Sequence, residues 1–141
     1  MSATDTLAET RPADTRMGKG VIAALSLSDA AAAVDFYRRA FGAQEVSRIP
    51  AEGGRKLIHV HLRINGGDFV FNDAFPEHGH PLEAPKGYSL LMAVDDIDAW
   101  WKRAIDAGAE EVMPVQKMFW GDRYGQLKDP FGVIWSLDEP A

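Results

Sequence analysis

The chain has 141 residues, of which 15 are basic and 21 acidic, so its formal net charge at pH 7 is −6. An acidic chain without a basic run argues against nucleic acid as a partner, because phosphate contacts need a positively charged surface. It contains no cysteine, which excludes disulfides, thiolate nucleophiles and cysteine-ligated metal centres and is compatible with the cytoplasmic location that we expect. No segment reaches the ~20 apolar residues of a membrane-spanning helix, so we also expect no membrane partner.

The chain begins with a polar segment. Residues 1–19 are rich in Ala, Thr and Asp and lack the apolar stretch of a secretory signal. We expect a flexible N-terminal tail here, and the alternative is that this tail lies over a neighbouring subunit. Dense periodic patterning begins at Gly20, so we predict a single domain over residues 20–138.

The same order of sequence signals occurs twice along this domain. Residues 21–46 and 88–112 each contain a short apolar strand, an aspartate of N-cap type, an amphipathic helical stripe and a Gly-Ala helix stop. Segments with the alternation of β-strands follow each helix, at 44–49, 56–65 and 68–73 in the first half and at 111–118, 123–128 and 133–137 in the second. We therefore predict an α+β fold of two βαβββ modules, at about 20–75 and 86–138, joined by a proline-rich connector at 74–87.

Alternation along the predicted strands separates an apolar face from a more polar one. In the strand at 57–64, one face carries Ile58, Val60, Leu62 and Ile64, and the other carries Leu57, His59, His61 and Arg63. The same test places Ser26, Ser89 and Ser136 on the faces away from the helices. Helices on one side and a semi-polar opposite side predict a curved mixed sheet around a groove, and such grooves bind small molecules.

Three segments resemble a known family. They are DAAAAVDFYRRAFGA (29–43), HVHLRINGGDFVFND (59–73) and MFWGDRYGQLKDPFGVIWSL (118–137). Together they resemble the vicinal oxygen chelate superfamily, which includes glyoxalase I, extradiol dioxygenases and bleomycin-binding proteins. The WGDRYG motif at 120–125 is most similar to the PhnB-like branch. The resemblance implies two βαβββ modules around a ligand groove, assembled as a homodimer.

The resemblance also locates the positions of the superfamily's metal ligands. Metal-dependent members take one His, Gln or Glu from each of four strands, and matching the motifs places these positions at Ile22, Val70 (or Phe71), Ser89 and Ser136. Alkyl side chains have no lone pair to donate, and neutral hydroxyls are poor ligands beside imidazole or carboxylate. The resemblance therefore implies that the usual metal site is absent and no cofactor is bound, as in the bleomycin-binding members, which only sequester their ligand.

We accordingly predict a protein that sequesters or senses a small molecule, with no catalytic residue identified. The predicted groove residues are Ser26, His59, His61, Arg63, Ser89, Trp120, Tyr124 and Ser136. One alternative is a divergent metal-dependent lyase, isomerase or dioxygenase with a relocated metal site at His59 and His61, or with one of these histidines as general base. A further alternative is a dimeric interaction module in which the aromatic residues serve association only.

Overall fold

The computed structural model describes residues 12–79 and 81–141, and the chain divides into two compact units. The first unit runs to residue 82 and the second starts at 83, except that residues 39–41 belong to the second. The boundary at 82/83 falls inside the predicted connector. No helix among the described residues is both long and apolar enough to span a bilayer.

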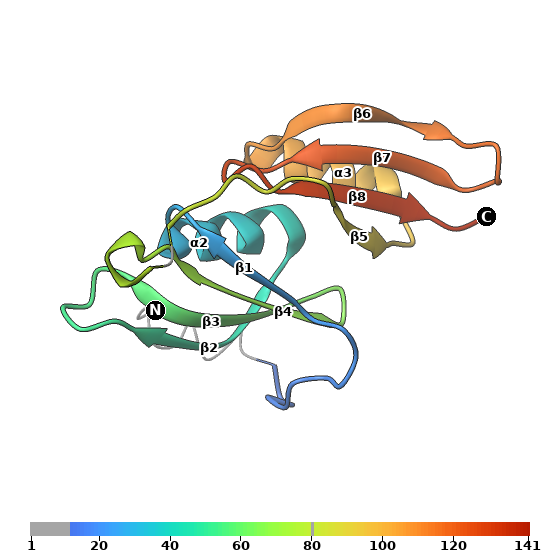
Figure 1. The fold of residues 1–141 in the computed structure, drawn as a ribbon. Coiled ribbons are helices and arrows are strands. Elements are labelled where there is room, and N and C mark those ends of the chain that lie inside the picture. Colours follow the sequence, from blue (N-terminus) through green and yellow to red (C-terminus); the bar gives the residue numbers. More distant parts are fainter. Residues whose placement is uncertain (1–11, 80) are drawn as a thin grey trace. The chain divides into compact units, whose positions relative to one another are not determined.

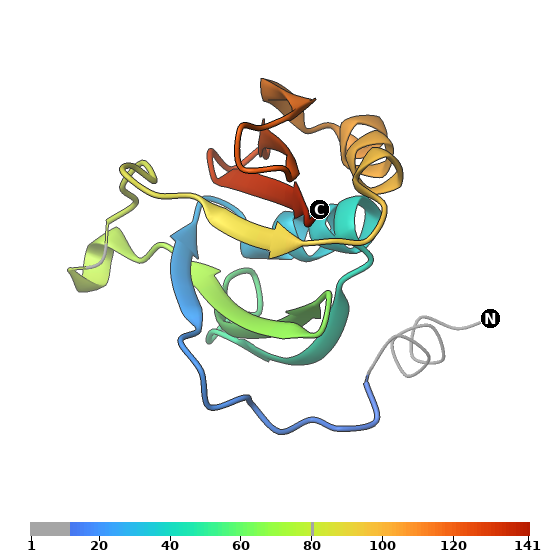
Figure 2. The same ribbon diagram turned by 90° about the vertical axis from the view of Figure 1, so that its right-hand side faces the viewer.

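The first unit contains a βαβββ module. Its elements are β1 (Ala23–Leu27), α2 (Ala30–Phe41), β2 (Gln44–Pro50), β3 (Leu57–Ile64), β4 (Gly67–Asp73) and the short 3₁₀ helix η1 (Pro76–His78). The strands form a four-stranded sheet in the order β1-β4-β3-β2, in which β1 is parallel to β4 and the other pairs are antiparallel (Figure 1). Helix α2 lies on one side of this sheet, and the chain that leads into β1 runs along the other side (Figure 2).

The second unit repeats this topology. Its elements are β5 (Leu90–Ala93), α3 (Ile97–Ala107), β6 (Glu110–Lys117), β7 (Arg123–Lys128) and β8 (Ile134–Glu139). They form a second four-stranded sheet in the order β5-β8-β7-β6, again with one parallel pair, β5 with β8 (Figure 1). The predicted α+β class and the two βαβββ modules are confirmed.

Both helices begin and end where the sequence signals lie. The Asp29 side chain accepts a hydrogen bond from the Ala32 amide over 3.1 Å, and Asp96 accepts one from Ala99 over 3.2 Å. Each side chain thereby satisfies an amide that the first helical turn leaves without a partner. Gly42 and Gly108 end the helices with φ values of 66° and 116°, a conformation that glycine adopts without the cost a side chain would add.

A carboxylate at the end of the last strand adds a second N-terminal contact in each module. Asp73 at the end of β4 accepts from the Ala30 amide over 2.8 Å, and Glu139 at the end of β8 accepts from the Ile97 amide over 3.0 Å. The repeat seen in the sequence is therefore also a repeat of hydrogen bonds. In both modules these bonds attach the first turn of the helix to the last strand of the module.

One predicted face is wrong at its first residues. Ile58 is 47% exposed and Leu57 only 4% exposed, the reverse of the expected assignment. The reason is a register shift: Ile49 pairs with His59 but Pro50 pairs with Leu57, so Ile58 is an extra residue in β3. Such a bulge reverses the side-chain alternation. From Val60 onward the alternation holds, and Val60, Leu62 and Ile64 are buried as predicted.

Aromatic packing settles which residue of β4 faces the helix. The buried Tyr37 of α2 contacts Phe69 and Phe71 edge-on, with ring centroids 5.3 and 5.9 Å apart. Because neighbouring side chains alternate across a strand, Val70 lies on the opposite face of the sheet. Val70 and Phe71 were both considered for one metal-ligand position. Val70 is the one on the face of the sheet away from the helix, which we call the open face.

Candidate functional site

Three of the predicted groove residues meet on the sheet face of the second module that lies away from α3. Ser89 Oγ lies 2.7 Å from Ser136 Oγ, and Tyr124 Oη lies 2.8 Å from the same atom. A fourth residue, Gln126, joins them through Nε2, which lies 3.0 Å from Tyr124 Oη and 3.2 Å from Ser136 Oγ. We call Ser89, Tyr124, Gln126 and Ser136 the second-module network.

The pairing of the strands explains why these side chains meet. Gln126 of β7 stands opposite Ser136 of β8 in the antiparallel register. Tyr124 lies two residues before Gln126, so both side chains project from the same face. Gln126 was not among the groove residues predicted from the sequence. Leu127 beside it is fully buried, so Gln126 projects from the opposite face of β7. The alternation that assigned the serines would also have placed Gln126 on the open face.

With Tyr124 and Gln126 as donors to Ser136, counting donors and acceptors gives the direction of the Ser89–Ser136 hydrogen bond. The fully buried Ser136 hydroxyl has one hydrogen and two lone pairs, and both lone pairs accept, one from Tyr124 and one from Gln126. Its own hydrogen is therefore donated to Ser89 Oγ. Ser89 keeps one O–H donor, and Gln126 keeps its carbonyl oxygen Oε1 as an acceptor. The network thus presents an uncharged donor and an uncharged acceptor.

Aromatic side chains border the second-module network. Trp120, which is 47% exposed, lies in the loop between β6 and β7 with its ring centroid 6.0 Å from that of Tyr124. Phe119 is almost fully exposed and contacts Trp120 edge-on at 4.8 Å. The structure thereby connects the predicted groove residue Trp120 to Ser89 and Ser136 through Tyr124. It places a flat apolar surface next to neutral hydrogen-bonding groups.

Two carboxyl groups lie near the network, Asp138 in β8 and Asp122 directly before β7. Asp138 pairs with Tyr124 across the strands and lies two residues after Ser136, on the same face. Burial raises the pKa of the Asp138 carboxyl, and the neighbouring Asp122 raises it further. The pKa of Asp122 is lowered by its hydrogen bond with Asp138 and by that from the Ala141 amide, which lies 3.0 Å away. Of the two carboxyl groups, Asp138 is therefore the one that ionises at the higher pH.

The corresponding face of the first module has a small hollow. It has a volume of about 170 Å³ and is lined by Ser26, His59, Val70 and Asn72, among others. Ser26 Oγ donates to Asn72 Oδ1 over 2.8 Å, in the register that pairs β1 with β4. The predicted residues Ser26 and His59 therefore lie together, but in a hollow that is small for an organic ligand.

The other two predicted residues of this face, His61 and Arg63, form an ionic cluster with Asp68. His61 Nε2 and Arg63 Nε donate to Asp68 Oδ1 over 2.7 and 2.9 Å. His61 is only 3% exposed. We call these three residues the first-module cluster. The groups that meet at Asp68 bond to one another, so the cluster stabilises this face.

Residues 14–18 lie against the first-module cluster. The Gly18 amide donates to Asp68 Oδ2 over 2.9 Å, while the Arg63 guanidinium donates to the carbonyls of Asp14 and Arg16, the latter over 2.8 Å. Burial acts to raise the pKa of Asp68, but the hydrogen bonds from Gly18, His61 and Arg63 outweigh it and hold this pKa below its usual value. Of the tail predicted over 1–19, residues 1–11 lie outside the described residues.

The donor sets do not fit the metal ion that the fold family uses in other members. The four expected positions carry Ile22, Val70, Ser89 and Ser136, which offer two alkyl groups and two neutral hydroxyls. The relocated set also fits poorly, because His61 already bonds Asp68 and the Arg63 cation contacts the same carboxylate oxygen. Among residues 12–79 and 81–141, no group of three or more His, Asp and Glu could hold a metal.

Paired βαβββ modules, each with its own sheet and capped helix, define the class of this fold. The chain belongs to the Glyoxalase/Bleomycin resistance protein/Dioxygenase superfamily, whose model matches residues 21–137. This match confirms the superfamily that the three sequence segments predicted. An uncharacterised protein of Mycobacterium bovis is 43% identical over 123 residues, which cover 83% of this chain and 80% of that protein.

Solved structures share the fold. TioX of Micromonospora sp. ML1 is 27% identical and superimposes with a TM-score of 0.68, covering 87% of this chain and 97% of TioX. A PhnB protein of Bacillus cereus, at 20% identity and a TM-score of 0.65, covers 84% of this chain and 98% of its own. At that identity the likeness concerns the fold alone.

Proposed function

We propose that this protein binds a small organic molecule on the open sheet face of its second module, without a metal ion, and thereby sequesters or senses it. The second-module network carries this proposal. It holds one buried and three half-buried polar side chains in fixed directions and leaves the Ser89 donor and the Gln126 acceptor free. Fixed polar groups beside apolar surface are what small-molecule sites use to orient a ligand.

The chemistry of the site indicates the kind of ligand. Trp120 and Tyr124 present flat rings, which favour a planar apolar group. The ligand would accept a hydrogen bond from Ser89 and donate one to Gln126, as a heteroaromatic amide does. No charged side chain belongs to the network, so the ligand is recognised by shape and neutral hydrogen bonds.

Binding without a metal is supported by the residues at the four metal-ligand positions. Ile22 and Val70 cannot coordinate an ion, and the Ser136 hydroxyl already takes part in three hydrogen bonds. A metal-dependent isomerase or dioxygenase needs an open coordination site that polarises the substrate or activates oxygen. The bleomycin-binding members that the sequence resembles act by sequestration alone, and we assign this chain to the same mode of action.

Two finer assignments belong to the same proposal. We assign the chain to the PhnB-like branch on the WGDRYG motif at 120–125. We also assign it a homodimeric state, which the superfamily resemblance supports. Sedimentation equilibrium tests that state: a mass twice that of the chain is expected, and a monomer would contradict it.

A ligand screen tests the function. A panel of planar heteroaromatic amides is screened by thermal shift, and hits are titrated by calorimetry with and without EDTA. We expect a binder whose affinity EDTA leaves unchanged and which Ser89→Ala weakens about tenfold, because one hydrogen bond to the ligand is lost. The matched control Ser26→Ala removes a hydroxyl from the first module and should bind as the wild type does. Affinity that disappears with EDTA would contradict the proposal, and so would a panel without any binder.

A further inference from the structure

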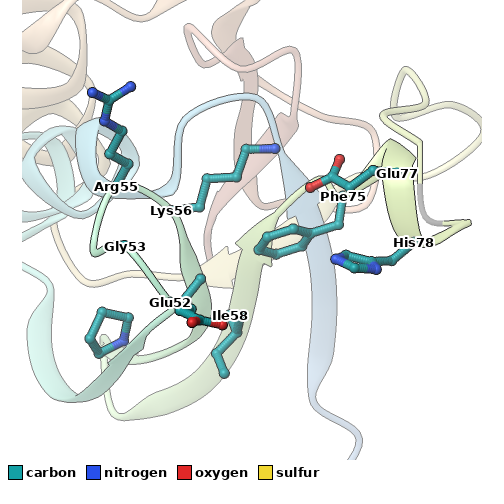
Figure 3. Close-up of a pocket in the computed structure, with 10 residues that line it drawn as sticks. Glu52, Gly53, Arg55, Lys56, Ile58, Phe75, Glu77 and His78 are labelled. Atoms are coloured by element: carbon teal, nitrogen blue, oxygen red, sulfur yellow. The ribbon is translucent and has the colours of Figure 1, made fainter.

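The first module contains a second, larger pocket that no sequence signal indicated. It lies between the loop that joins β2 to β3 and the segment Phe75–His78, and its volume is about 690 Å³ (Figure 3). All of its lining residues belong to the first unit. Small-molecule pockets typically have volumes of about 300–1,000 Å³. We call it the hairpin pocket.

The bulge in β3 gives this pocket its apolar floor. Because Ile58 is the extra residue at the bulge, its side chain turns away from the core and is 47% exposed. It lines the pocket together with Pro50 and the half-buried Phe75 (Figure 3). The strand irregularity that reverses the predicted face thus also places apolar surface on the outside of the module.

One half-buried cation stands over this floor. Lys56 Nζ donates to the Ala74 carbonyl over 2.8 Å and lies 4.9 Å from the centre of the Phe75 ring. An ammonium group has three N–H donors, so two remain after the bond to Ala74. Among the described residues no carboxylate lies within ion-pair distance of Lys56. Removing a charge from water without a counterion is unfavourable, so this position favours an anionic ligand.

The other charged residues of the pocket limit the charge of that ligand. Glu52 and Glu77 are exposed and line the same pocket, so they repel a ligand that carries several negative charges. Arg55 is also exposed, and its side chain extends away from Phe75 (Figure 3). Lys56 is therefore the cation that points over the apolar floor. The arrangement suits one negative charge attached to an apolar body.

We propose that the hairpin pocket is a binding site for an apolar monocarboxylate, whose carboxylate pairs with Lys56 and whose body lies on Ile58 and Phe75. Charge-assisted hydrogen bonds from an ammonium to a carboxylate are about twice as strong as neutral ones, which makes Lys56 the main determinant of affinity. The proposal is independent of the proposed function, because it rests on a different module and a ligand of different charge.

Two probes of the same size test the charge requirement in the wild-type protein. The ¹⁵N-labelled full chain is titrated with 3-phenylpropionate and, separately, with the uncharged 3-phenylpropan-1-ol, and amide shifts are followed by NMR. Saturable shifts at Ile58, Phe75 and His78 are expected with the acid, and about tenfold weaker binding with the alcohol. The amides of Ser89, Gln126 and Ser136 should not move, which separates this site from the proposed one.

Variants then test the role of Lys56. Lys56→Gln should bind 3-phenylpropionate about tenfold more weakly. Lys128→Gln removes an exposed cation of the second module, outside the hairpin pocket, and should bind it as the wild type does. An unchanged spectrum in the absence of probe shows that each variant is folded. Four outcomes would each overturn the proposal. Two concern affinity: equal binding of acid and alcohol, or wild-type affinity in Lys56→Gln. The other two concern the spectra: no saturable amide shifts, or amide shifts that change with protein concentration and not with added probe.

Discussion

The open sheet faces of the two modules differ although their frameworks are the same. His61 and Gln126 occupy equivalent positions, opposite Val70 in the first module and Ser136 in the second. In the first module this position belongs to an ionic cluster against which residues 14–18 lie. In the second it belongs to a neutral network bordered by exposed aromatic residues. One backbone register therefore supports an ionic face covered by residues 14–18 and a neutral hydrogen-bonded face bordered by aromatic side chains.

The helix-bearing sides of the two modules, in contrast, are alike. Both helices keep an aspartate N-cap, a glycine C-cap and a carboxylate contact from the last strand. These groups satisfy backbone amides and carbonyls that every helix end exposes, whatever the protein does. The open faces carry no such general requirement, so their side chains are free to differ. The comparison therefore indicates that function should be sought on the open faces.

The largest effect is expected from breaking the first-module cluster. Arg63→Met should lower the free energy of unfolding by about 3 kcal/mol, because Asp68 loses its guanidinium partner while remaining buried. The carbonyls of Asp14 and Arg16 also lose their donor, so hydrogen exchange at the Gly18 amide should accelerate. Urea denaturation and exchange measured by NMR check both effects. The exposed Arg55→Met is the matched control, and an equally small loss in both variants would contradict the role of the cluster.

Removing the centre of the second-module network should cost less. Ser136→Ala leaves the Tyr124 hydroxyl and one Gln126 N–H without their acceptor, which should lower the free energy of unfolding by about 1–3 kcal/mol. Ser26→Ala removes a hydroxyl on the exposed side of the first sheet and should cost less than about 0.5 kcal/mol. Urea denaturation measures the difference. Equal losses of unfolding free energy in the two variants would contradict a stabilising role for the second-module network.

Lowering the pH should reduce the stability that Asp68 gives to the folded protein. Because the pKa of Asp68 is lowered in the folded protein, its stabilising contribution is complete above the usual aspartate pKa of ~3.9 and is lost as the pH falls through the native value. The stability difference between the wild type and Asp68→Asn should therefore shrink below about pH 4. Denaturation over a pH series measures this. The exposed Asp106→Asn should differ little from the wild type, and a difference for Asp68→Asn that does not vary with pH would contradict the prediction.

The smallest effect, of opposite sign, is expected at Asp138. Its pKa is raised by burial and by Asp122, so ionisation is harder in the folded than in the unfolded protein and costs stability as the pH rises above the usual aspartate value. Asp138→Asn should therefore raise the melting temperature near neutral pH, and the gain should disappear in acid. Thermal denaturation at both pH values checks this, with the exposed Asp95→Asn as control. A lower melting temperature at neutral pH would contradict the raised pKa of Asp138.

Some features were predictable because they depend on local patterns. The Asp29 cap and the glycine stops rest on groups within one helical turn, and the faces of Ser26, Ser89 and Ser136 follow from alternation within one strand. The superfamily followed from short contiguous motifs such as WGDRYG. The local error at Ile58 came from a bulge that depends on how β3 pairs with β2.

Thus the sequence alone determined the paired modules, their superfamily and most residues of the candidate network, because periodicity, capping and motifs act over a few neighbouring residues. Only the tertiary structure joined Gln126 to Ser136 and brought residues 14–18 against Arg63 and Asp68. The hairpin pocket at Lys56 was also recognisable only in the tertiary structure. These contacts join residues far apart along the chain or depend on strand register, and the folded backbone sets both.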